Sequence, residues 1–194
     1  MIIKGDSLDL LLSRLETYDL IVTDPPYAFS GSGAEHQLSA TVAIVLREAA
    51  ARLEKGSWMV VFAASSWRST QYVVDSVRGI LEPIRIGHWN KPVSRSKART
   101  PGWAWASVNV IALRKGKAKP TTPSPLLDHI TCPPLTVGRR AELPPEVASW
   151  AVEPFVVPGG LFLDPFAGSG ALVRAAEQAQ MTGLGFDVAP QESP

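Results

Sequence analysis

The sequence predicts an α/β fold built around a mostly parallel β-sheet. Short apolar runs alternate with segments whose apolar residues recur at helical spacing, and this alternation is typical of strands joined by crossover helices. The chain has 194 residues, of which 45% are hydrophobic and 19% charged. This composition suits one globular core and excludes a disordered chain, so we expect a single domain over residues 1–194.

In the first half of the chain, apolar runs and turn residues set the expected elements. Strands are expected at residues 1–4, 19–23, 57–64 and 83–89. Pro25 and Pro26 end the second of these strands, because proline cannot donate to a sheet ladder. Helices are expected at residues 7–15, 40–53 and 69–81, the first of them capped by Asp6 or Ser7. The Gly- and Ser-rich residues 28–39 are expected to form a loop.

The second half continues the alternation with fewer regular segments. Strands are expected at residues 104–114, 161–163 and 183–188, and we expect the first of these to run antiparallel to its neighbour. Helices are expected at residues 144–155, with proline in the first turn, and at residues 171–179. Residues 91–102 are basic and loop-like, and residues 116–138 are rich in Pro and Thr, so both segments are expected to be irregular.

One segment suited to binding a ligand is Asp-Pro-Phe-Ala-Gly-Ser-Gly at residues 164–170, between an expected strand and an expected helix. Glycines there let the backbone turn tightly and approach a ligand, and the helix start offers free N–H groups. Asp187 ends the next strand and can accept both hydroxyls of a ribose. Val173 stands where a dinucleotide site has a third glycine, which favours a nucleoside with a short charged tail. Alone, the loop also fits a structural turn.

The other segment is Asp24-Pro25-Pro26-Tyr27, at the C-terminal end of an expected strand. The prolines remove two N–H donors, which leaves only acceptors: the Asp24 carboxylate and the Pro25 carbonyl. Such a pair suits an exocyclic amino group, which has two hydrogens to donate, and Tyr27 offers a face for stacking a base. Alone, the tetrapeptide also fits a proline-rich turn with Tyr27 in the core.

Basic residues are concentrated in one stretch. Nine of the 19 Lys and Arg residues lie between positions 85 and 119, where no Asp or Glu occurs. This basic tract favours one face directed at a polyanion, and Trp89, Trp103 and Trp105 within it are able to stack on bases. The same pattern fits a solvated loop, so charge alone leaves both interpretations open.

Four motifs together resemble the amino-group DNA methyltransferases that use S-adenosylmethionine. The two segments above carry most of the resemblance, and their order, with Asp-Pro-Pro-Tyr about 140 residues before the glycine loop, resembles the permuted β-class. Gly5-Asp6-Ser7 is similar to that class's opening motif, and residues 183–188 are similar to its ribose-binding strand. Trp89-Asn90-Lys91-Pro92 and residues 109–116 resemble the strands after the catalytic loop.

The resemblance implies a Rossmann-like methyltransferase fold, with a mostly parallel seven-stranded sheet, one antiparallel strand and helices on both faces. It implies methyl transfer from S-adenosylmethionine to the amino group of a flipped base in DNA, with Asp24 favouring adenine N6 over cytosine N4. The implied catalytic residues are Asp24, Pro25, Pro26 and Tyr27. The implied cofactor-binding residues are Asp6, Ser7, Asp164, Pro165, Phe166, Ala167, Gly168, Ser169, Gly170, Asp187 and Val188. Lys91, Arg95, Lys97 and Arg99 are expected to bind DNA phosphates.

The chain departs from the family in two places. Residues 137–144 lack the family's His-Pro and Lys-Pro pairs, so contacts made by that segment cannot be carried over. Residues 117–138 are too few for a target-recognition domain with its own core. Sequence specificity is then slight, or supplied by a partner such as a second copy of the chain, or read by the loops at residues 28–39 and 91–102.

Other classes are less consistent with the sequence. With Cys132 as its one cysteine and no zinc-ligand spacing, the chain is expected to hold no disulfide and no metal and to lie in a reducing cytoplasm, of a bacterial cell or phage-infected host. No apolar run reaches about 20 residues and no signal peptide is recognisable, so no membrane contact is expected. The open alternatives are methylation of RNA or of glutamine, a nicotinamide-dependent oxidoreductase, and a DNA-associated accessory subunit with weak or lost catalysis.

Overall fold

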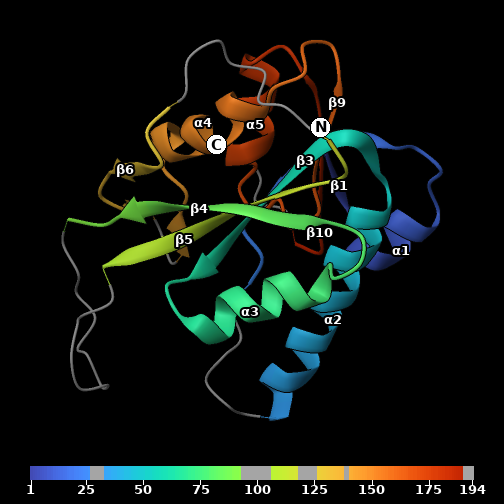
Figure 1. Ribbon diagram of the computed structural model, residues 1–194, viewed down its shortest axis with the longest axis horizontal. Helices are drawn as coiled ribbons and strands as arrows, with labels where there is room; N and C mark the ends of the chain where they lie inside the picture. The colour runs from blue at the N-terminus through green and yellow to red at the C-terminus, as the bar shows by residue number, and fades with distance from the viewer. Residues whose placement is uncertain (27–32, 93–105, 118–125, 138–139, 190–194) are drawn as a thin grey trace.

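The computed structural model describes residues 1–26, 33–92, 106–117, 126–137 and 140–189, and an eight-stranded sheet forms the centre of this part (Figure 1). The strand order is β1-β10-β9-β2-β3-β5-β4-β6. β5 runs antiparallel to both of its neighbours, and the other adjacent pairs are parallel. The bounds in this order are Ile2–Lys4, Thr182–Asp187, Leu161–Asp164, Tyr18–Thr23, Leu53–Ala64, Ser107–Arg114, Glu82–Asn90 and His129–Thr131.

The expected fold class is confirmed, with one strand more than the seven expected. The additional strand is β6, which pairs with β4 at the sheet edge. β7 (Leu135–Val137) and β8 (Arg140–Glu142) form a separate antiparallel hairpin. The expectation of irregular structure throughout residues 116–138 is therefore wrong at β6 and β7. A three-residue strand is too short to show a period of two, and the Pro- and Thr-rich composition around both strands favoured a loop.

Helices cover both faces of the sheet (Figure 1). α1 (Ser7–Leu12), α2 (Gly33–Ala51) and α3 (Trp67–Ser76) cover one face, and α4 (Pro145–Val152) and α5 (Ala171–Gln178) cover the other. The short 3₁₀ helix η1 (Glu153–Phe155) follows α4. Along β2, Leu20 and Val22 pack in one core and Ile21 packs in the other. Among the described helices, none is long and apolar enough to span a membrane.

Capping residues fix the starts of two helices, and the expected start of α2 is wrong. The Asp6 carboxylate accepts from the N–H groups of Leu8 and Asp9, at 2.9 and 3.2 Å, which confirms Asp6 as the cap of α1. Ser66 caps α3 in the same way. α2 begins at Gly33, not at residue 40, so the second part of the expected loop at residues 28–39 is helical. The residues between Gly33 and residue 40 include good helix formers. Their helix propensity outweighs the Gly- and Ser-rich composition that predicted a loop here.

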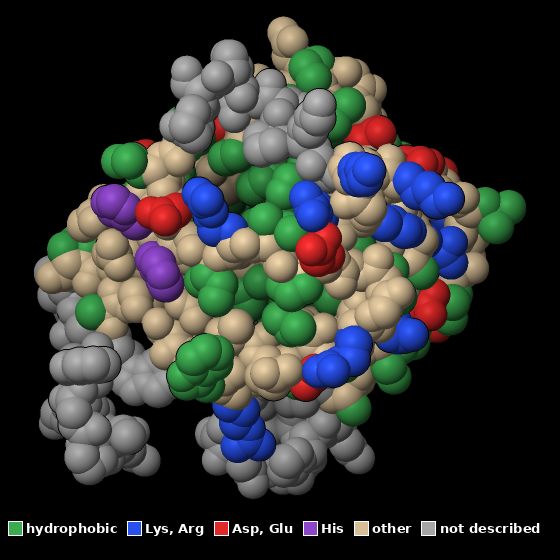
Figure 2. Space-filling view, in the orientation of Figure 1, with side chains coloured by type: hydrophobic (Ala, Val, Ile, Leu, Met, Phe, Trp, Pro, Cys, Tyr) green, Lys and Arg blue, Asp and Glu red, His purple; other side chains and the backbone are tan. Residues whose placement is uncertain are grey.

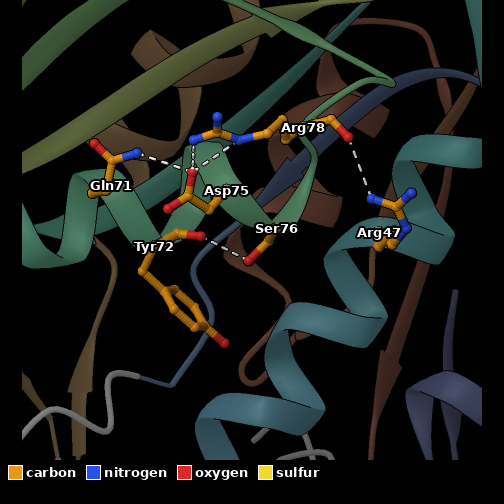
Figure 3. A network of polar contacts seen from close by, with 6 residues as sticks. All are labelled: Arg47, Gln71, Tyr72, Asp75, Ser76 and Arg78. Carbon is orange, nitrogen blue, oxygen red and sulfur yellow. Dashed lines mark hydrogen bonds and ion pairs between the residues drawn. The ribbon is translucent and has the colours of Figure 1, made fainter.

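Exposed polar contacts connect the end of α3 to α2 (Figure 3). The Asp75 carboxylate accepts from Gln71 at 3.0 Å and from the Arg78 guanidinium, and these hydrogen bonds hold the pKa of Asp75 below its usual value. Arg47 on α2 then donates to the Arg78 carbonyl at 3.3 Å. The turn after α3 is therefore held from both helices, although such exposed pairs each stabilise a protein only slightly.

Lys115, a member of the basic tract, has a structural position at the end of α2. Its ammonium donates to the carbonyls of Ala50, Ala51 and Leu53, at 3.2, 2.7 and 2.6 Å. The last carbonyls of a helix lack intrahelical partners, and a cation there also interacts favourably with the helix dipole. Partial burial lowers the pKa of Lys115.

We predict that Lys115→Met lowers the free energy of unfolding by about 1–2 kcal/mol, because three carbonyls lose a charged donor. Urea denaturation followed by circular dichroism measures this difference. Lys117→Met is the matched control, because Lys117 is exposed and surface substitutions of this kind change stability by about 0.5 kcal/mol or less. Equal stabilities of the two variants would contradict the capping role.

Candidate active site

The carboxyl ends of four parallel strands meet at one edge of the sheet. β9 lies between β10 and β2, and the register pairs Leu20 with Phe162 and Ile21 with Leu163. The segments that follow β1, β2, β9 and β10 therefore lie beside one another, although they are far apart in the sequence. In open parallel sheets, this edge is where ligands bind.

The loop between β9 and α5 turns sharply because two of its glycines have left-handed backbone angles. Gly168 has a φ of 50°, and Gly170, which precedes α5, has a φ of 80°. A Cβ atom on Gly170 would lie 2.6 Å from the end of the Ile2 side chain, so a larger residue requires that side chain to shift and is also strained by the positive φ. The Ala167 N–H donates to the Phe186 carbonyl at 2.9 Å, which connects the loop to β10.

Close packing of α5 on β10 depends on glycines in the strand. Val173 on α5 occupies the place of the third glycine of a dinucleotide-binding loop. A Cβ atom on Gly183 or Gly185 would lie 2.9 Å from the Val173 side chain, and one on Gly185 would lie 2.6 Å from the Ala167 Cβ. The strand therefore supplies the small residues that let the helix approach, and the loop does not need its third glycine.

Asp187 organises the glycine loop from the end of β10. Its Oδ2 accepts from the Gly168 N–H at 2.9 Å, and its Oδ1 accepts from the Ala189 N–H at 2.7 Å. A carboxylate offers about four acceptor positions, so these two bonds leave capacity for a ligand. Asp187 also lines the cavity described below, which is consistent with its expected role as a ribose-binding acid.

Asp164 is almost completely buried and joins β9 to β2. Its Oδ1 accepts from the Thr23 hydroxyl at 2.7 Å and from the Phe166 N–H at 3.0 Å. Burial raises the pKa of Asp164 to about 7, the two hydrogen bonds oppose this shift, and the negative charges of Asp24 and Asp187 add to it. Asp164 was expected to bind the cofactor, but it is not among the residues lining the cavity, and its contacts are with the protein framework.

A cavity of about 740 Å³ lies at this edge of the sheet. It brings together predicted catalytic and cofactor-binding residues, so Asp24 and Gly168 share one cavity. The predicted site residues in its lining are Asp6, Ser7, Asp24, Pro25, Pro26, Lys91, Phe166, Gly168, Asp187 and Val188. The described residues Pro165, Ala167, Ser169 and Gly170 are not in the lining and support the loop; the Pro165 carbonyl, for example, accepts from the Ser7 hydroxyl at 2.6 Å. Tyr27, Arg95, Lys97 and Arg99 lie outside the described residues.

The cavity also has lining residues that the sequence did not indicate. Glu142, at the end of β8, and Leu143 line it beside the glycine loop. Arg174 on α5 connects Glu142 to the glycine loop, since it donates to Glu142 at 3.4 Å and to the Ser169 carbonyl at 2.6 Å. The departure from the family pattern at residues 137–144 hid this contribution. The remaining additions are Thr41, Val45, Val108 and Ala189, and the cavity is also lined by Trp89, which was expected to stack on bases, and by Phe186 of the expected ribose-binding strand.

The charged residues described in the lining are mostly acidic. Asp6, Asp24, Glu142 and Asp187 are the acids, and Lys91 is the one cation among the described lining residues. Burial lowers the pKa of Lys91, and the negative charge of Asp24 opposes this shift. The cavity therefore carries a negative field that favours cationic ligands.

The described members of the basic tract do not share one face. Lys91 lines the cavity, Lys115 caps α2, and Arg114 forms an ion pair with Glu82 at 2.8 Å. Figure 2 shows Lys and Arg side chains scattered over one side of the molecule, with Asp and Glu among them. The interpretation of the tract as one continuous basic face is therefore wrong for these residues, because β4 and β5 are antiparallel and Lys91 lies at the opposite end of this pair from Arg114 and Lys115.

A second cavity, of about 570 Å³, lies between the sheet and α4. It is lined mainly by apolar side chains, including Trp58, Trp150 and Phe155, with Arg85 and Asp128 also present. Figure 2 shows a hollow with hydrophobic side chains at its floor and Lys or Arg at its margin. Its lining contains none of the predicted catalytic or cofactor-binding residues.

Comparisons with known proteins establish the fold. No family model matches the chain, and no curated protein matches it. The chain is similar to the solved structure of M1.HpyAVI in complex with SAM, with a TM-score of 0.76, 19% identity and coverage of 96% of this chain and 92% of that one. It is also similar to TTHA0409 from Thermus thermophilus, described as a DNA modification methylase and complexed with S-adenosyl-L-methionine, with a TM-score of 0.74, 21% identity and coverage of 97% and 89%. The chain has the Rossmann-like methyltransferase fold.

A further solved structure with this fold is the cytosine-N4-specific PvuII DNA methyltransferase. The TM-score is 0.74 and the identity 17%, over 97% of this chain and 82% of that one. The three similarities extend over nearly the whole chain, as the motif resemblance did. At these identities they confirm the architecture.

We predict that the buried Asp164 makes the protein less stable as the pH rises from about 4 to about 7. Its folded-state pKa of about 7 lies above the ordinary value of 3.8, so the folded state holds the proton longer and loses that advantage over this range. Asp164→Asn should flatten this decline, because the amide oxygen still accepts from Thr23 without a charge. Urea denaturation across this pH range measures the effect.

Asp9→Asn serves as the control, because Asp9 is exposed on α1. It should leave the pH dependence of stability unchanged. If Asp164→Asn shows the same decline as the wild type over this range, another group is responsible for the dependence.

Proposed function

We propose that this protein transfers a methyl group from S-adenosylmethionine to the exocyclic amino group of a base in DNA, with adenine N6 as the target. The observation that carries the proposal is that Asp24 and Pro25 line the same cavity as Gly168 and Asp187. An amino acceptor and a methyl donor can therefore meet in one space. Two of the similar solved structures contain S-adenosylmethionine, and another is a cytosine-N4-specific DNA methyltransferase.

The residues of the cavity fit this cofactor. A Cβ atom on Gly168 would meet no atom within 4 Å, so the bare backbone there leaves room for a ligand. The lining acids favour a molecule with a sulfonium and an ammonium group, and they disfavour the pyrophosphate of a nicotinamide dinucleotide. Asp187 would hold the ribose of the cofactor and Asp6 its adenine. Glu142 would face the positive charge of the cofactor. When bound, the cofactor supplies an electrophilic methyl group on sulfur.

The end of β2 supplies an acceptor-only surface for the target amine. The lone pair of an aromatic amine is delocalised into the ring, which makes the nitrogen a poor nucleophile. Asp24 and the Pro25 carbonyl would accept its two hydrogens, favour a pyramidal nitrogen and stabilise the positive charge that develops on it. Pro25 and Pro26 support this role because neither has an N–H that would compete for the carboxylate.

The target base has to leave the duplex, because a stacked base cannot present its amino group to a cavity. We assign Tyr27 the role of stacking on the flipped base, and Arg95, Lys97 and Arg99 the role of holding phosphates, which would make binding sensitive to salt. The single domain over residues 1–194, with only residues 117–138 in the place of a recognition region, implies slight specificity or a specificity partner. We infer a cytoplasmic location in a bacterial or phage-infected cell, where the enzyme would serve DNA modification.

The second candidate function is that of an accessory subunit with the same fold and weak catalysis. Leu143 favours it, because an apolar side chain lines the cavity where the family's Lys-Pro segment would be expected. Measured turnover with several DNA substrates separates the two. The accessory subunit binds DNA or the cofactor without turnover.

We predict that Asp24→Ala lowers the rate of methyl transfer to DNA by about 10²–10³-fold, because the positive charge that develops on the amino nitrogen loses the carboxylate that stabilises it. Transfer of a radiolabelled methyl group to DNA measures the rate, and circular dichroism checks the fold. Asp9→Ala, which removes an exposed acid from α1, should keep wild-type activity. Activity of Asp24→Ala within a few-fold of the wild type would contradict the assigned role.

We predict N6-methyladenine as the product, because Asp at the first motif position favours adenine enzymes in the family that the sequence resembles. Digestion of methylated DNA to nucleosides, followed by mass analysis, identifies the product directly. N4-methylcytosine would retain the proposed chemistry and change the base.

A further inference from the structure

Lys91 has a position that its expected contact with DNA phosphates does not explain. It follows directly after β4, and its N–H donates to the Ala106 carbonyl at 2.7 Å, which continues the pairing with the β5 side of the sheet. Its side chain is half-buried and lines the cavity that contains Asp24. A residue that binds outer phosphates would be expected to project into solvent, whereas the Lys91 side chain lines the cavity.

The described residues around Lys91 hold its ammonium in place and leave its donors available. The ammonium lies 4.3 Å from the ring centroid of Trp89, a favourable cation–π arrangement. Trp89 is itself fixed, since it is 4% exposed and its indole N–H donates to the Cys132 carbonyl at 2.8 Å. No residue in the described part of the chain accepts a hydrogen bond from the Lys91 ammonium. A half-buried ammonium has three donors to satisfy, so a ligand acceptor in the cavity is expected.

The cavity therefore presents acceptors and a donor to one ligand. Adenine and cytosine each carry an amino group beside an unprotonated ring nitrogen, N1 in adenine and N3 in cytosine. Guanine and thymine carry the reverse pair, a carbonyl oxygen beside a ring N–H. A site with acceptors at Asp24 and Pro25 and a donor at Lys91 matches the first pair and mismatches the second.

On the basis of the proposed function, we propose that Lys91 donates a hydrogen bond to the ring nitrogen beside the target amino group and so selects amino bases. Lys91 then determines specificity within the cavity, while Asp24 and Pro25 hold the amino hydrogens. A base without an acceptor nitrogen at this ring position leaves the Lys91 ammonium unpaired. An unpaired charged donor of this kind lowers the rate by about 10- to 100-fold.

The test pairs a variant with a substrate analogue that lacks the same contact. DNA carries either the methylated base or its deaza analogue, 1-deazaadenine or 3-deazacytosine, which replaces the ring nitrogen with C–H. The preference for the natural base over the analogue, as a ratio of kcat/KM, is measured for the wild type and for Lys91→Met. Comparing the two ratios cancels the intrinsic reactivity of the analogue, as in a double-mutant cycle.

We expect the wild-type ratio to exceed the Lys91→Met ratio by about 10- to 100-fold, and Lys91→Arg to recover part of the difference. Lys117→Met, an exposed lysine outside the cavity, should retain the wild-type ratio. A purely structural or phosphate-binding role lowers activity on both substrates equally, so equal ratios in the wild type and Lys91→Met overturn the inference.

The outcomes also separate this inference from the proposed function. A wild-type enzyme that methylates no DNA overturns the proposed function, and the inference with it. A wild-type enzyme that methylates DNA with equal ratios overturns the role of Lys91 alone. If Lys91→Met does not fold, Lys91→Ala, which also lacks a side-chain donor, provides the same comparison of ratios.

Discussion

The direct pairing of β2 with β9 is the constraint on which the site depends. It places Asp24 beside a glycine loop that begins about 140 residues later in the chain. The buried hydrogen bond from Thr23 to Asp164, at 2.7 Å, joins the last residues of the two strands. Because side chains alternate along a strand, a slip of one residue would turn Asp24 away from the loop and break this bond. The cavity is therefore a consequence of strand register as much as of its lining residues.

The fold class could be predicted because the central strands are apolar runs separated by helical periodicity, and burial on both faces produces such runs in parallel sheets. The candidate site could be located because Asp24 and the glycine loop follow strands and Asp187 ends one. β6, β7 and β8 were not predicted, because three residues carry no recognisable period and, unlike β1, these strands lie in a part of the chain that is rich in Pro. Glu142 was missed for a related reason: its position at the cavity depends on how the hairpin packs, which no local pattern encodes.

The basic tract illustrates a different limit of the sequence. Counting charges along the chain treats neighbours in sequence as neighbours in space, but a strand sends successive side chains to opposite faces. Arg114 and Lys115 are adjacent in sequence, yet one pairs with Glu82 and the other caps α2. Only the fold determines which members of such a tract are available to a polyanion. Lys91, for example, lines the cavity.

The acids around the glycine loop form a coupled system. Asp24 and Asp187 line the cavity, and their charges raise the pKa of the buried Asp164 beyond the effect of burial. Conversely, positive charge in the cavity would offset that repulsion and make ionisation of Asp164 less costly. Since Asp164 accepts from both Thr23 and Phe166, its ionisation strengthens the bonds that join β2, β9 and the loop. A cationic ligand in the cavity would therefore strengthen the hydrogen bonds that join the two strands and the glycine loop.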